Sequence, residues 1–488
     1  MKEGDIMGKF VKIIITVLFI LIVNTVFSLV LYTYGHDVPP KYFIKDGKIQ
    51  GLCNDIISEL NKELKSSNIE IRYKSNTLFT PNEVLEKLER NEIQILVGIG
   101  YFQEKEDNLE YVKFPLYSIR ETFTIRKGME DKINTLQNVR IGVIGGTLPS
   151  RKVSSIFKKS EIKTFKNPQE AISALDKGTI DAIFWATLPH GYYISLYPDK
   201  YNNIELMSEK IYHYVVVSKN LSKVVTDKIY KAIKVVNEKG VIENLIKKYK
   251  LDGLALPGNN VEILLVHWKP YEWYDEKEGK WKGFDVDTVS SVFKRLGFQA
   301  IFRTLPWERC LGAMKVYAYD GIMSVIVSDE RKEFLLYPDE PLSTGVDVLF
   351  RMKNRNIPLD SIENIPKTII CGYSSGYGYG SWFWNAPFTK EPVIDDVTGF
   401  TLLRNGRLDL FVCNLIVGKS IAKDLGMEKD VVYSKNFGEK MIYYLAFSKN
   451  FHGSFLQALF AQELKNFKKT QEYREILKRY GLEYNDLW

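Results

Sequence analysis

Short apolar runs alternate with amphipathic stretches along most of the chain. Apolar runs of five to eight residues predict strands, and the longer runs with helical spacing predict helices. Alternation of the two is typical of α/β folds with mainly parallel sheets. The predicted strands are Leu29–Tyr34, 95–100, 140–147, Glu262–Trp268, 321–327 and 368–376, and the predicted helices start near Asp55 and Asp287 or span Asn82–Asn91 and Trp307–Tyr317.

The same pattern occurs twice, because the two halves of the chain repeat each other. GKIQGLCND (47–55) matches GKWKGFDVD (279–287), KGTIDAIF (177–184) matches NGRLDLFV (405–412), and IKKYKL (246–251) matches LKRYGL (477–482). Two copies of a unit of roughly 230 residues follow from this spacing. A second series of strands and helices starts inside each copy, at residues 140 and 368, so each copy is expected to have two lobes. The predicted domains are residues 29–251 and 261–488, joined by a linker at 252–260 that is rich in Gly, Pro and Asn.

The first 28 residues have the composition of an export signal. Lys2, Lys9 and Lys12 precede an apolar run that begins at Ile13, and Val26-Phe27-Ser28 offers small residues at the spacing of a signal-peptidase site. Cleavage near Ser28 would place the protein in the periplasm or outside the cytoplasm. The alternative is an uncleaved anchor in the inner membrane formed by residues 10–31, and either segment would be the chain's only membrane contact.

Composition and charge exclude several classes of protein. The net charge is +7, and the 67 basic and 60 acidic residues are dispersed along the chain, which argues against a nucleic-acid partner. Its four cysteines form no CxxC pair and have no histidine at metal-ligand spacing, so no metal or other cofactor is expected. Cys371 and Cys413 could pair in an oxidising compartment, but buried thiols are the favoured interpretation.

The acidic pair in GKWKGFDVD raises the question of a metal site. Asp285 and Asp287 form a DxD motif, but a cation normally needs more oxygen ligands nearby. The first copy has Cys53 in place of Asp285. A structural role in the first turn of a helix, where acids cap free N–H groups and offset the helix dipole, is therefore favoured.

GYSSG (372–376) matches the GxSxG motif of serine hydrolases. It follows a predicted strand, and Asp409 and His452 come later in the order that such enzymes use. The corresponding stretch of the first copy, 142–147, has no serine. The glycine-rich loop is equally suited to hold an anionic or polar ligand through its N–H and hydroxyl groups. The hydrolase hypothesis stays open as an alternative to binding.

VIVSDERKEFLLYPDEPL (325–342), together with GFDVD at the first helix, resembles the extracellular solute-binding proteins of family 3. The resemblance covers nearly the whole mature chain, twice. It implies two tandem type II periplasmic-binding domains, each with two lobes that close on a ligand about a hinge. It further implies that Arg331, in the segment Ser328-Asp-Glu-Arg331, holds the ligand's carboxylate, which a guanidinium can do with two parallel hydrogen bonds.

The resemblance carries over unequally to the two copies. The first copy has no arginine in the corresponding residues 101–108, but it has the family's Gly146-Thr147, which could hold a carboxylate. Ser374-Ser375 is expected at that place in the second copy. The aspartate that binds an α-amino group in the family is Ala186 in one copy and Asn414 in the other, so neither copy fits a standard α-amino-acid site.

Aromatic residues cluster where a cleft of the second copy is expected, after strands and in glycine-rich loops. The first copy offers fewer such residues. The candidate ligand-binding residues are Trp268, Trp307, Ser324, Ser328, Arg331, Tyr373, Ser374, Ser375 and Asn414 in the second copy and Tyr101, Gly146 and Thr147 in the first.

These features predict an exported binding protein, not an enzyme. Its small-molecule ligand would be polar or carboxylate-bearing and amino-acid-like, and the expected partner is an ABC importer's permease. Two alternatives remain: a sensory module that reports ligand to a membrane receptor, and an enzyme on the same fold, either the GYSSG hydrolase or a dehydratase.

Overall fold

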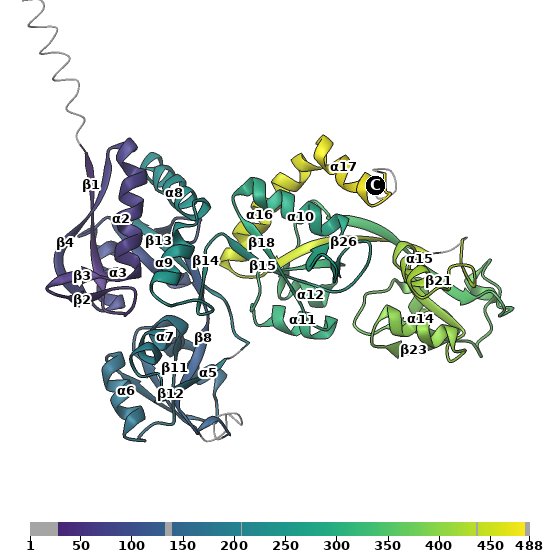
Figure 1. Cartoon of the computed structure of the whole chain (residues 1–488), viewed down its shortest axis with the longest axis horizontal. Helices are drawn as coiled ribbons and strands as arrows, with labels where there is room; N and C mark the ends of the chain where they lie inside the picture. The colour runs from purple at the N-terminus through teal and green to yellow at the C-terminus, as the bar shows by residue number, and fades with distance from the viewer. Residues whose placement is uncertain (1–27, 132–138, 206, 436–437, 484–488) are drawn as a thin grey trace, which may run out of the picture. The chain divides into compact units, whose positions relative to one another are not determined.

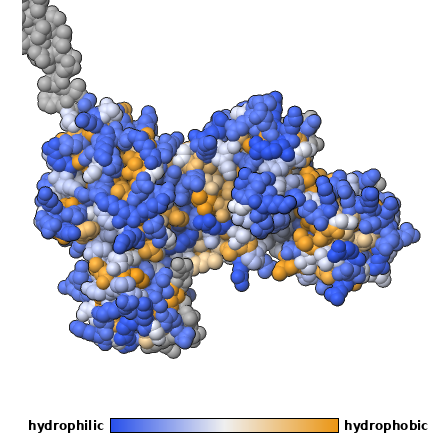
Figure 2. Space-filling view, in the orientation of Figure 1, coloured by the Kyte–Doolittle hydropathy of each residue, from blue (hydrophilic) through white to orange (hydrophobic). Residues whose placement is uncertain are grey.

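The computed structural model describes residues 28–131, 139–205, 207–435 and 438–483. Two compact units make up the chain: the first runs to Glu205 and includes Ile211–Gly258, and the second includes Leu206–Lys210 and runs from Asn259 onward. Each unit contains two α/β lobes (Figure 1). Hydrophilic side chains cover most of the face seen in Figure 2, and apolar ones gather only in small groups, as expected for a globular protein.

The first lobe of unit one is built on β1, β4, β5 and β13. β1 pairs with β4 in parallel, and β13 pairs antiparallel with β5, β6 and β7. Its elements are β1 (Leu29–His36), β2 (Phe43–Lys45), β3 (Lys48–Gln50), α2 (Leu52–Leu64), η1 (Lys65–Ser67), β4 (Ile69–Phe79), α3 (Pro81–Glu89), β5 (Ile95–Gly100), η2 (Gln103–Lys105), β6 (Leu109–Tyr111), β7 (Tyr117–Ile119), β13 (Ile211–Ser218), α8 (Lys223–Glu238), α9 (Val241–Lys248) and β14 (Ala255–Pro257).

The second lobe of unit one is a five-stranded sheet in the order β10-β9-β11-β8-β12, covered by α5, α6 and α7. Its elements are β8 (Glu121–Arg126), β9 (Arg140–Ile144), α5 (Leu148–Ile156), β10 (Glu161–Phe165), α6 (Pro168–Asp176), β11 (Ala182–Ala186), α7 (Thr187–Leu196) and β12 (Tyr201–Glu205). The chain enters this lobe after β7 and leaves it before β13, so these two segments form the hinge.

Unit two repeats this plan, with one sheet that continues through both lobes. The first lobe contains β15 (Asn260–Leu265), β16 (Trp273–Asp275), β17 (Lys280–Lys282), α10 (Phe284–Leu296), β18 (Gln299–Thr304), α11 (Trp307–Lys315), β19 (Gly321–Val325), α12 (Asp329–Lys332), β20 (Leu335–Leu336), β26 (Glu439–Ser448), α16 (Phe451–Phe467) and α17 (Gln471–Arg479). The second contains β21 (Ser343–Met352), η3 (Ile362–Asn364), β22 (Ile370–Ser374), α13 (Ser381–Trp384), β23 (Thr389–Val393), α14 (Asp396–Arg404), β24 (Leu410–Asn414), α15 (Leu415–Asp424) and β25 (Val431–Tyr433). β21 and β26 run side by side from one lobe to the other (Figure 1).

The predicted α/β class and the two tandem two-lobed domains are confirmed, and the sheets are mixed. Strands that follow a helix within a lobe pair in parallel, such as β15 with β18 and β19. The strands at the hinge pair antiparallel, because they carry the chain to the second lobe and back. Residues 255–257, within the expected linker, form β14, which pairs with β7. Unit one therefore extends to Gly258.

The repeated sequence segments have a structural cause in both units. Gly51 and Gly283 precede α2 and α10 with φ of 126° and 138°, and a Cβ there would lie 2.3 and 2.0 Å from the carbonyl oxygens of Lys41 and Tyr271. Only glycine allows this close approach. The helices consequently begin at Leu52 and Phe284, three residues before the acids from which they were predicted to start.

A second pair of matched residues, Asp181 and Asp409, joins neighbouring strands in the sheet of each second lobe. Asp181 accepts hydrogen bonds from the backbone N–H of Arg140 at 3.0 Å and from its guanidinium. Asp409 accepts from the backbone N–H of Ile370, also at 3.0 Å. Each aspartate thus joins the start of one parallel strand to the loop before its neighbour. The similarity between KGTIDAIF and NGRLDLFV follows from this shared role.

Candidate functional site: two clefts with different chemistry

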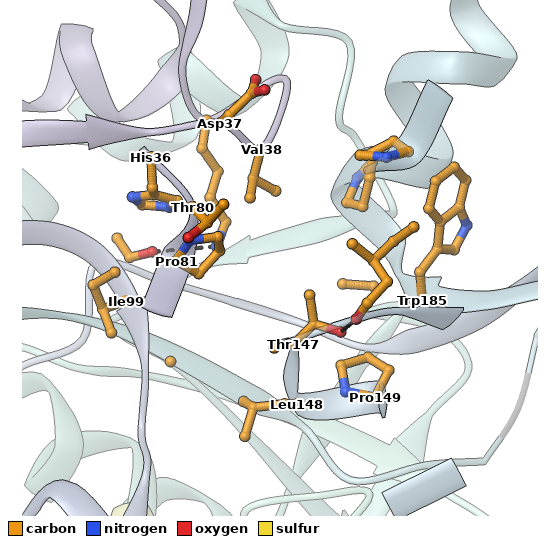
Figure 3. Close-up of a pocket in the computed structure, with 18 of the residues that line it drawn as sticks. His36, Asp37, Val38, Thr80, Pro81, Ile99, Thr147, Leu148, Pro149 and Trp185 are labelled. Atoms are coloured by element: carbon orange, nitrogen blue, oxygen red, sulfur yellow. Dashed lines mark hydrogen bonds between the residues drawn. The ribbon is translucent and has the colours of Figure 1, made fainter. Parts of the chain in front are cut away.

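The first unit encloses a cavity of about 340 Å³ between its lobes. His36, Val38, Thr80 and Ile99 line it from the first lobe. The other wall comes from the second lobe, where Thr147, Leu148, Pro149 and Trp185 lie opposite them (Figure 3). A cavity of this size, mostly apolar with a few polar groups, is typical of small-molecule sites.

Lys41 is the buried positive charge of this cavity, whose lining also includes the exposed residues Asp37 and Lys166. Its side chain is buried, with 8% exposed, and its ammonium group donates to the carbonyl oxygen of Gly98 at 3.2 Å. Burial is the main cause that lowers the pKa of Lys41 to about 8, so the group is still mostly protonated at pH 7. No acidic side chain among the described residues forms an ion pair with it. A buried ammonium without a counter-ion favours an anionic ligand.

Two histidines lie beside Lys41 and line the same cavity. Burial lowers the pKa of both His36 and His213 well below 6.5, and the charge of Lys41 lowers it further, so both rings are neutral at pH 7. Within the described part of the chain, neither ring nitrogen of His36 has a hydrogen-bond partner, nor has Nδ1 of His213. His213 stacks on Tyr117 with ring centroids 4.9 Å apart. The histidines can therefore donate to or accept from a ligand without adding charge.

The second lobe contributes the turn Gly146-Thr147 and the start of α5. Gly146 has φ of 76°, and Thr147 is the N-cap residue of α5, with its hydroxyl donating to the Ile144 carbonyl oxygen at 2.7 Å. The first N–H groups of a helix attract anions. Trp185 forms part of the apolar wall, and its Nε1 donates to Thr124 at 2.6 Å.

Of the three ligand-binding residues predicted in the first copy, two line the cavity and one does not. Gly146 and Thr147 line the cavity, whereas Tyr101 is not among its lining residues and donates its hydroxyl to Glu106 at 2.8 Å. Lys105, which lies in the segment 101–108 that has no arginine, pairs with Glu89 at 2.9 Å.

The second unit has a much smaller cavity, about 50 Å³, between its lobes. Of the candidates in this copy, Trp268, Trp307, Ser324 and Arg331 line it. The other lining residues are Val266, Ile326, Asp347, Tyr377, Gly378, Tyr379 and Tyr443. Aromatic side chains contribute much of this lining, and the space left is far smaller than in the first unit.

The guanidinium of Arg331 is already occupied by main-chain groups. Its Nη1 donates to Ile326 O at 3.2 Å and its Nη2 to Gly376 O at 3.0 Å. Trp307 Nε1 donates to the same Gly376 oxygen at 2.7 Å. Gly376 belongs to the second lobe, so these two bonds join the lobes where the sequence predicted a ligand carboxylate. Ser328 lies outside the cavity lining and caps α12 by accepting from Arg331 N.

The strand register corrects the predicted equivalence of Ser374-Ser375 with Gly146-Thr147. Gly145 N donates to Phe165 O and Ser375 N to Val393 O, at the same point of each sheet, and the next residues, Gly146 and Gly376, both have positive φ. Gly376-Tyr377 therefore corresponds to Gly146-Thr147. The sequence alignment slipped because the residue after the turn glycine is Tyr377 in this copy, where the first copy has Thr147.

The remaining candidates of the second copy lie beside the cavity. Tyr373 packs against Tyr379 and Trp384, and Ser375 donates to Glu308 at 2.9 Å. Asn414 is the N-cap residue of α15, and its Nδ2 donates to the hydroxyls of Tyr271 (3.2 Å) and Tyr443 (3.1 Å).

The hydrolase triad suggested by GYSSG does not form. Ser374 is fully buried and donates to Asp396 Oδ1 at 2.5 Å. Asp409 accepts from Ile370 N, and His452 lies on α16 of the other lobe. A nucleophilic serine needs a histidine as base within hydrogen-bond reach, so Ser374 has a structural role.

The acids of GKWKGFDVD are structural, although they do not act as capping groups. Asp285 is buried and accepts from Ser343 on β21 at 2.7 Å, and Asp287 accepts from Arg479 and Tyr480. Cys53, at the place of Asp285 in unit one, contacts the hydroxyl of Tyr117 on β7 at 3.4 Å. Both helices are thus fastened to the hinge from their first turn. Among the described residues no acid, histidine or cysteine cluster could hold a metal.

The cysteines and the N-terminal segment complete the comparison. All four cysteines are buried free thiols, so Cys371 and Cys413 are not paired. No helix in the described part of the chain has the length and apolarity to cross a membrane. The predicted signal or anchor lies, up to Phe27, outside the described residues.

Comparison with known proteins identifies the fold. The model of the bacterial extracellular solute-binding proteins, family 3, matches residues 29–252 and again residues 264–483. The chain belongs to this family. Its two units are tandem family 3 domains, and the family is one of binding proteins.

Two relatives and one solved structure show the range of similar proteins. The L-cystine-binding proteins TcyA of Bacillus subtilis (strain 168) and TcyJ of Escherichia coli (strain K12) are 21% and 24% identical over 182 and 184 residues. Each match spans 37% of this chain and 66% of the relative, just under two thirds of its length. The periplasmic domain of BvgS from B. pertussis is 12% identical, with 94% of this chain and 91% of that chain covered and a TM-score of 0.40.

Sequence reasoning missed Lys41, His213 and Asp347 as cleft residues. Lys41 follows Pro39-Pro40 and corresponds to Tyr271, which is fully buried. A lysine at a position that is apolar in the other copy was the available signal. His213 and Asp347 lie on hinge strands whose pairing only the structure shows.

Proposed function

We propose that the first unit captures a small carboxylate-bearing solute of amino-acid size from outside the cytoplasm. The observation that carries the proposal is the buried ammonium of Lys41, without an acidic partner among the described residues, at the wall of a 340 Å³ cavity. The carboxylate would pair with Lys41 and accept N–H groups at the start of α5. The family and its cystine-binding relatives support an amino-acid-like ligand.

The rest of the cavity constrains the body of the ligand. Ile99, Phe102, Leu148 and Trp185 line it with apolar surface. Ala186 leaves no carboxylate at the place where the family binds an α-amino group. The ligand is therefore a carboxylate with an apolar or flat body, whose polar substituents would be read by His36 and His213.

Ligand binding would be signalled by closure of the two lobes about the hinge formed by β7 and β13. A ligand that contacts both lobes stabilises the closed form, and a partner that recognises this form responds to the solute. We propose an ABC permease as this partner. A membrane receptor is the second candidate, because two clefts of different chemistry in one chain are more than the uptake of one solute requires.

Thermal unfolding of the mature chain tests the proposal. Small carboxylates with apolar or aromatic bodies should raise the melting temperature in proportion to the logarithm of their concentration. The matched primary alcohols and amides, which have the same bodies and no charge, are the controls. Equal shifts by the alcohols, or no shift by any carboxylate, would refute it.

A further inference from the structure

Asp347 is a buried acid in the second cleft, and no described residue donates a hydrogen bond to its side chain. It lies on the hinge strand β21, lines the cavity of about 50 Å³ and is 6% exposed. Burial and the neighbouring charges of Asp396 and Glu439 raise the pKa of Asp347 to about 8. A carboxylate in this position is stabilised by a cation that brings its own N–H donors.

The charges around the cavity are predominantly acidic. Asp396 accepts from Ser374 and from Trp268 Nε1 (3.1 Å), and Glu272 accepts from Ser324 (2.8 Å) and from Val266 N (3.2 Å). Burial is the main cause that raises the pKa of Asp396 to about 6 and of Glu272 to about 8. The cavity and its surroundings thus contain three carboxyl groups, those of Asp347, Asp396 and Glu272, and one guanidinium, that of Arg331.

Arg331 does not neutralise these acids. Its guanidinium donates to the two main-chain oxygens of Ile326 and Gly376 and lies over the ring of Trp307, 5.6 Å from the centroid. Among the ion pairs of the described residues, none joins Arg331 to Asp347. The guanidinium thus joins the two lobes, and the carboxyl group of Asp347 remains available to a ligand.

Aromatic rings make up most of the remaining wall. Trp268 packs edge-on against Tyr443 with ring centroids 5.0 Å apart, and Tyr377 and Tyr379 line the same cavity. The faces of such rings attract cations. A water needs roughly 10–15 Å³ measured in this way, so the cavity accommodates a group of a few heavy atoms.

We propose that the second unit binds a small organic cation, a protonated amine whose ammonium group pairs with Asp347 among the rings of Trp268, Tyr377 and Tyr443. This site is separate from that of the first unit and does not depend on the identity of its ligand. The carboxylate predicted for Arg331 is not part of it, since Gly376 O occupies that place. The two units would then respond to solutes of opposite charge.

Titration calorimetry of the full mature chain with ethylamine and ethanolamine at pH 8 tests the site. Both should bind the wild type, and Asp347→Asn, which keeps the shape and removes the charge, should weaken binding at least about thirtyfold. Glu121→Gln is the matched control, because Glu121 is buried and pairs with Ala186 as Asp347 pairs with Asn414, at the corresponding hinge position of unit one. It should leave amine affinity unchanged. Circular dichroism and thermal unfolding verify that both variants fold.

Other probes separate the alternatives. Propionate binding would show that a carboxylate can replace Gly376 O as the acceptor for Arg331. Glycine binding would show that the site prefers a zwitterion. Tetramethylammonium, a cation without N–H groups, shows whether hydrogen-bond donors are needed. The proposal predicts tight binding only for the amines, with weaker binding of tetramethylammonium. The proposal is overturned if Asp347→Asn binds the amines as tightly as the wild type does, or if neither amine binds the wild type. It is also overturned if the wild type binds propionate or glycine but not the amines.

Discussion

At the scale of single residues, Lys41 illustrates the balance between binding and stability. Its pKa is about 8 in the folded protein and about 10.4 when unfolded, so the folded state disfavours the charged form. Folding must carry this penalty, about 3 kcal/mol, at every pH below 8. A site that holds a charge ready for a ligand commonly reduces stability in this way.

Lys41→Met should therefore raise the free energy of unfolding at pH 7, by up to about 3 kcal/mol, while carboxylate binding is lost. In the wild type, the lysine's contribution should make stability increase between pH 8 and 10.5, because the unfolded state binds more protons there, and this increase should be absent in the variant. Denaturant titrations at pH 7 and 10 measure both effects. Lys105→Met, which removes the partner of Glu89, is the control and should not stabilise.

Ser374 offers a second test at this scale, because the structure gives it a structural role and not that of a nucleophile. Ser374→Ala removes a hydrogen bond to the buried carboxylate of Asp396 and should cost about 1–3 kcal/mol above pH 6. Ser375→Ala, beside it, breaks an exposed bond to Glu308 and should cost less than about 1 kcal/mol. A fluorophosphonate probe should label neither serine in the wild type. Labelling at Ser374 would contradict the structural role.

At the scale of elements, the repeat units depend on how α2 and α10 begin. Gly51→Ala and Gly283→Ala place a Cβ against a carbonyl oxygen and force an alanine into positive φ, so each should destabilise its unit by more than about 2 kcal/mol. Gly47→Ala is the matched control: its φ is 70° and no atom lies within 4 Å of the added Cβ. Its cost should be about 1 kcal/mol. Thermal unfolding compares the three, and equal losses would contradict this account.

The elements were largely predictable from the sequence, and the contents of the clefts were not. Local patterns determine β1, β5, α3 and β22, which formed within a few residues of their predicted bounds. A cleft is assembled from residues far apart in the chain, such as Lys41, Thr147 and His213, and only the fold brings them together. Arg331 was recognised as a cleft residue from its local motif, but its contact with Gly376 O depends on the position of the second lobe.

At the scale of the whole molecule, the two units should respond differently to pH. In unit two, the pKa is raised by burial to about 7 in Asp285, to about 8 in Glu272 and Asp347, and to about 6 in Asp396. All four bind protons more tightly when folded, so their contribution to stability is present at low pH and is lost as pH rises from about 4 to 8. Calorimetric scans from pH 5 to 8 should show the unfolding transition of unit two moving to lower temperature as the pH rises. Asp347→Asn should reduce this movement, and an unchanged movement would contradict the assignment.

The central claim is that the first unit, through Lys41, is the one that binds a carboxylate. The most direct measurement compares the carboxylate-dependent rise in melting temperature of the mature chain with those of Lys41→Met and Arg331→Met. The account predicts that Lys41→Met abolishes the rise and that Arg331→Met retains it. Loss of the rise in Arg331→Met with its retention in Lys41→Met would contradict the account and assign the carboxylate to the second unit.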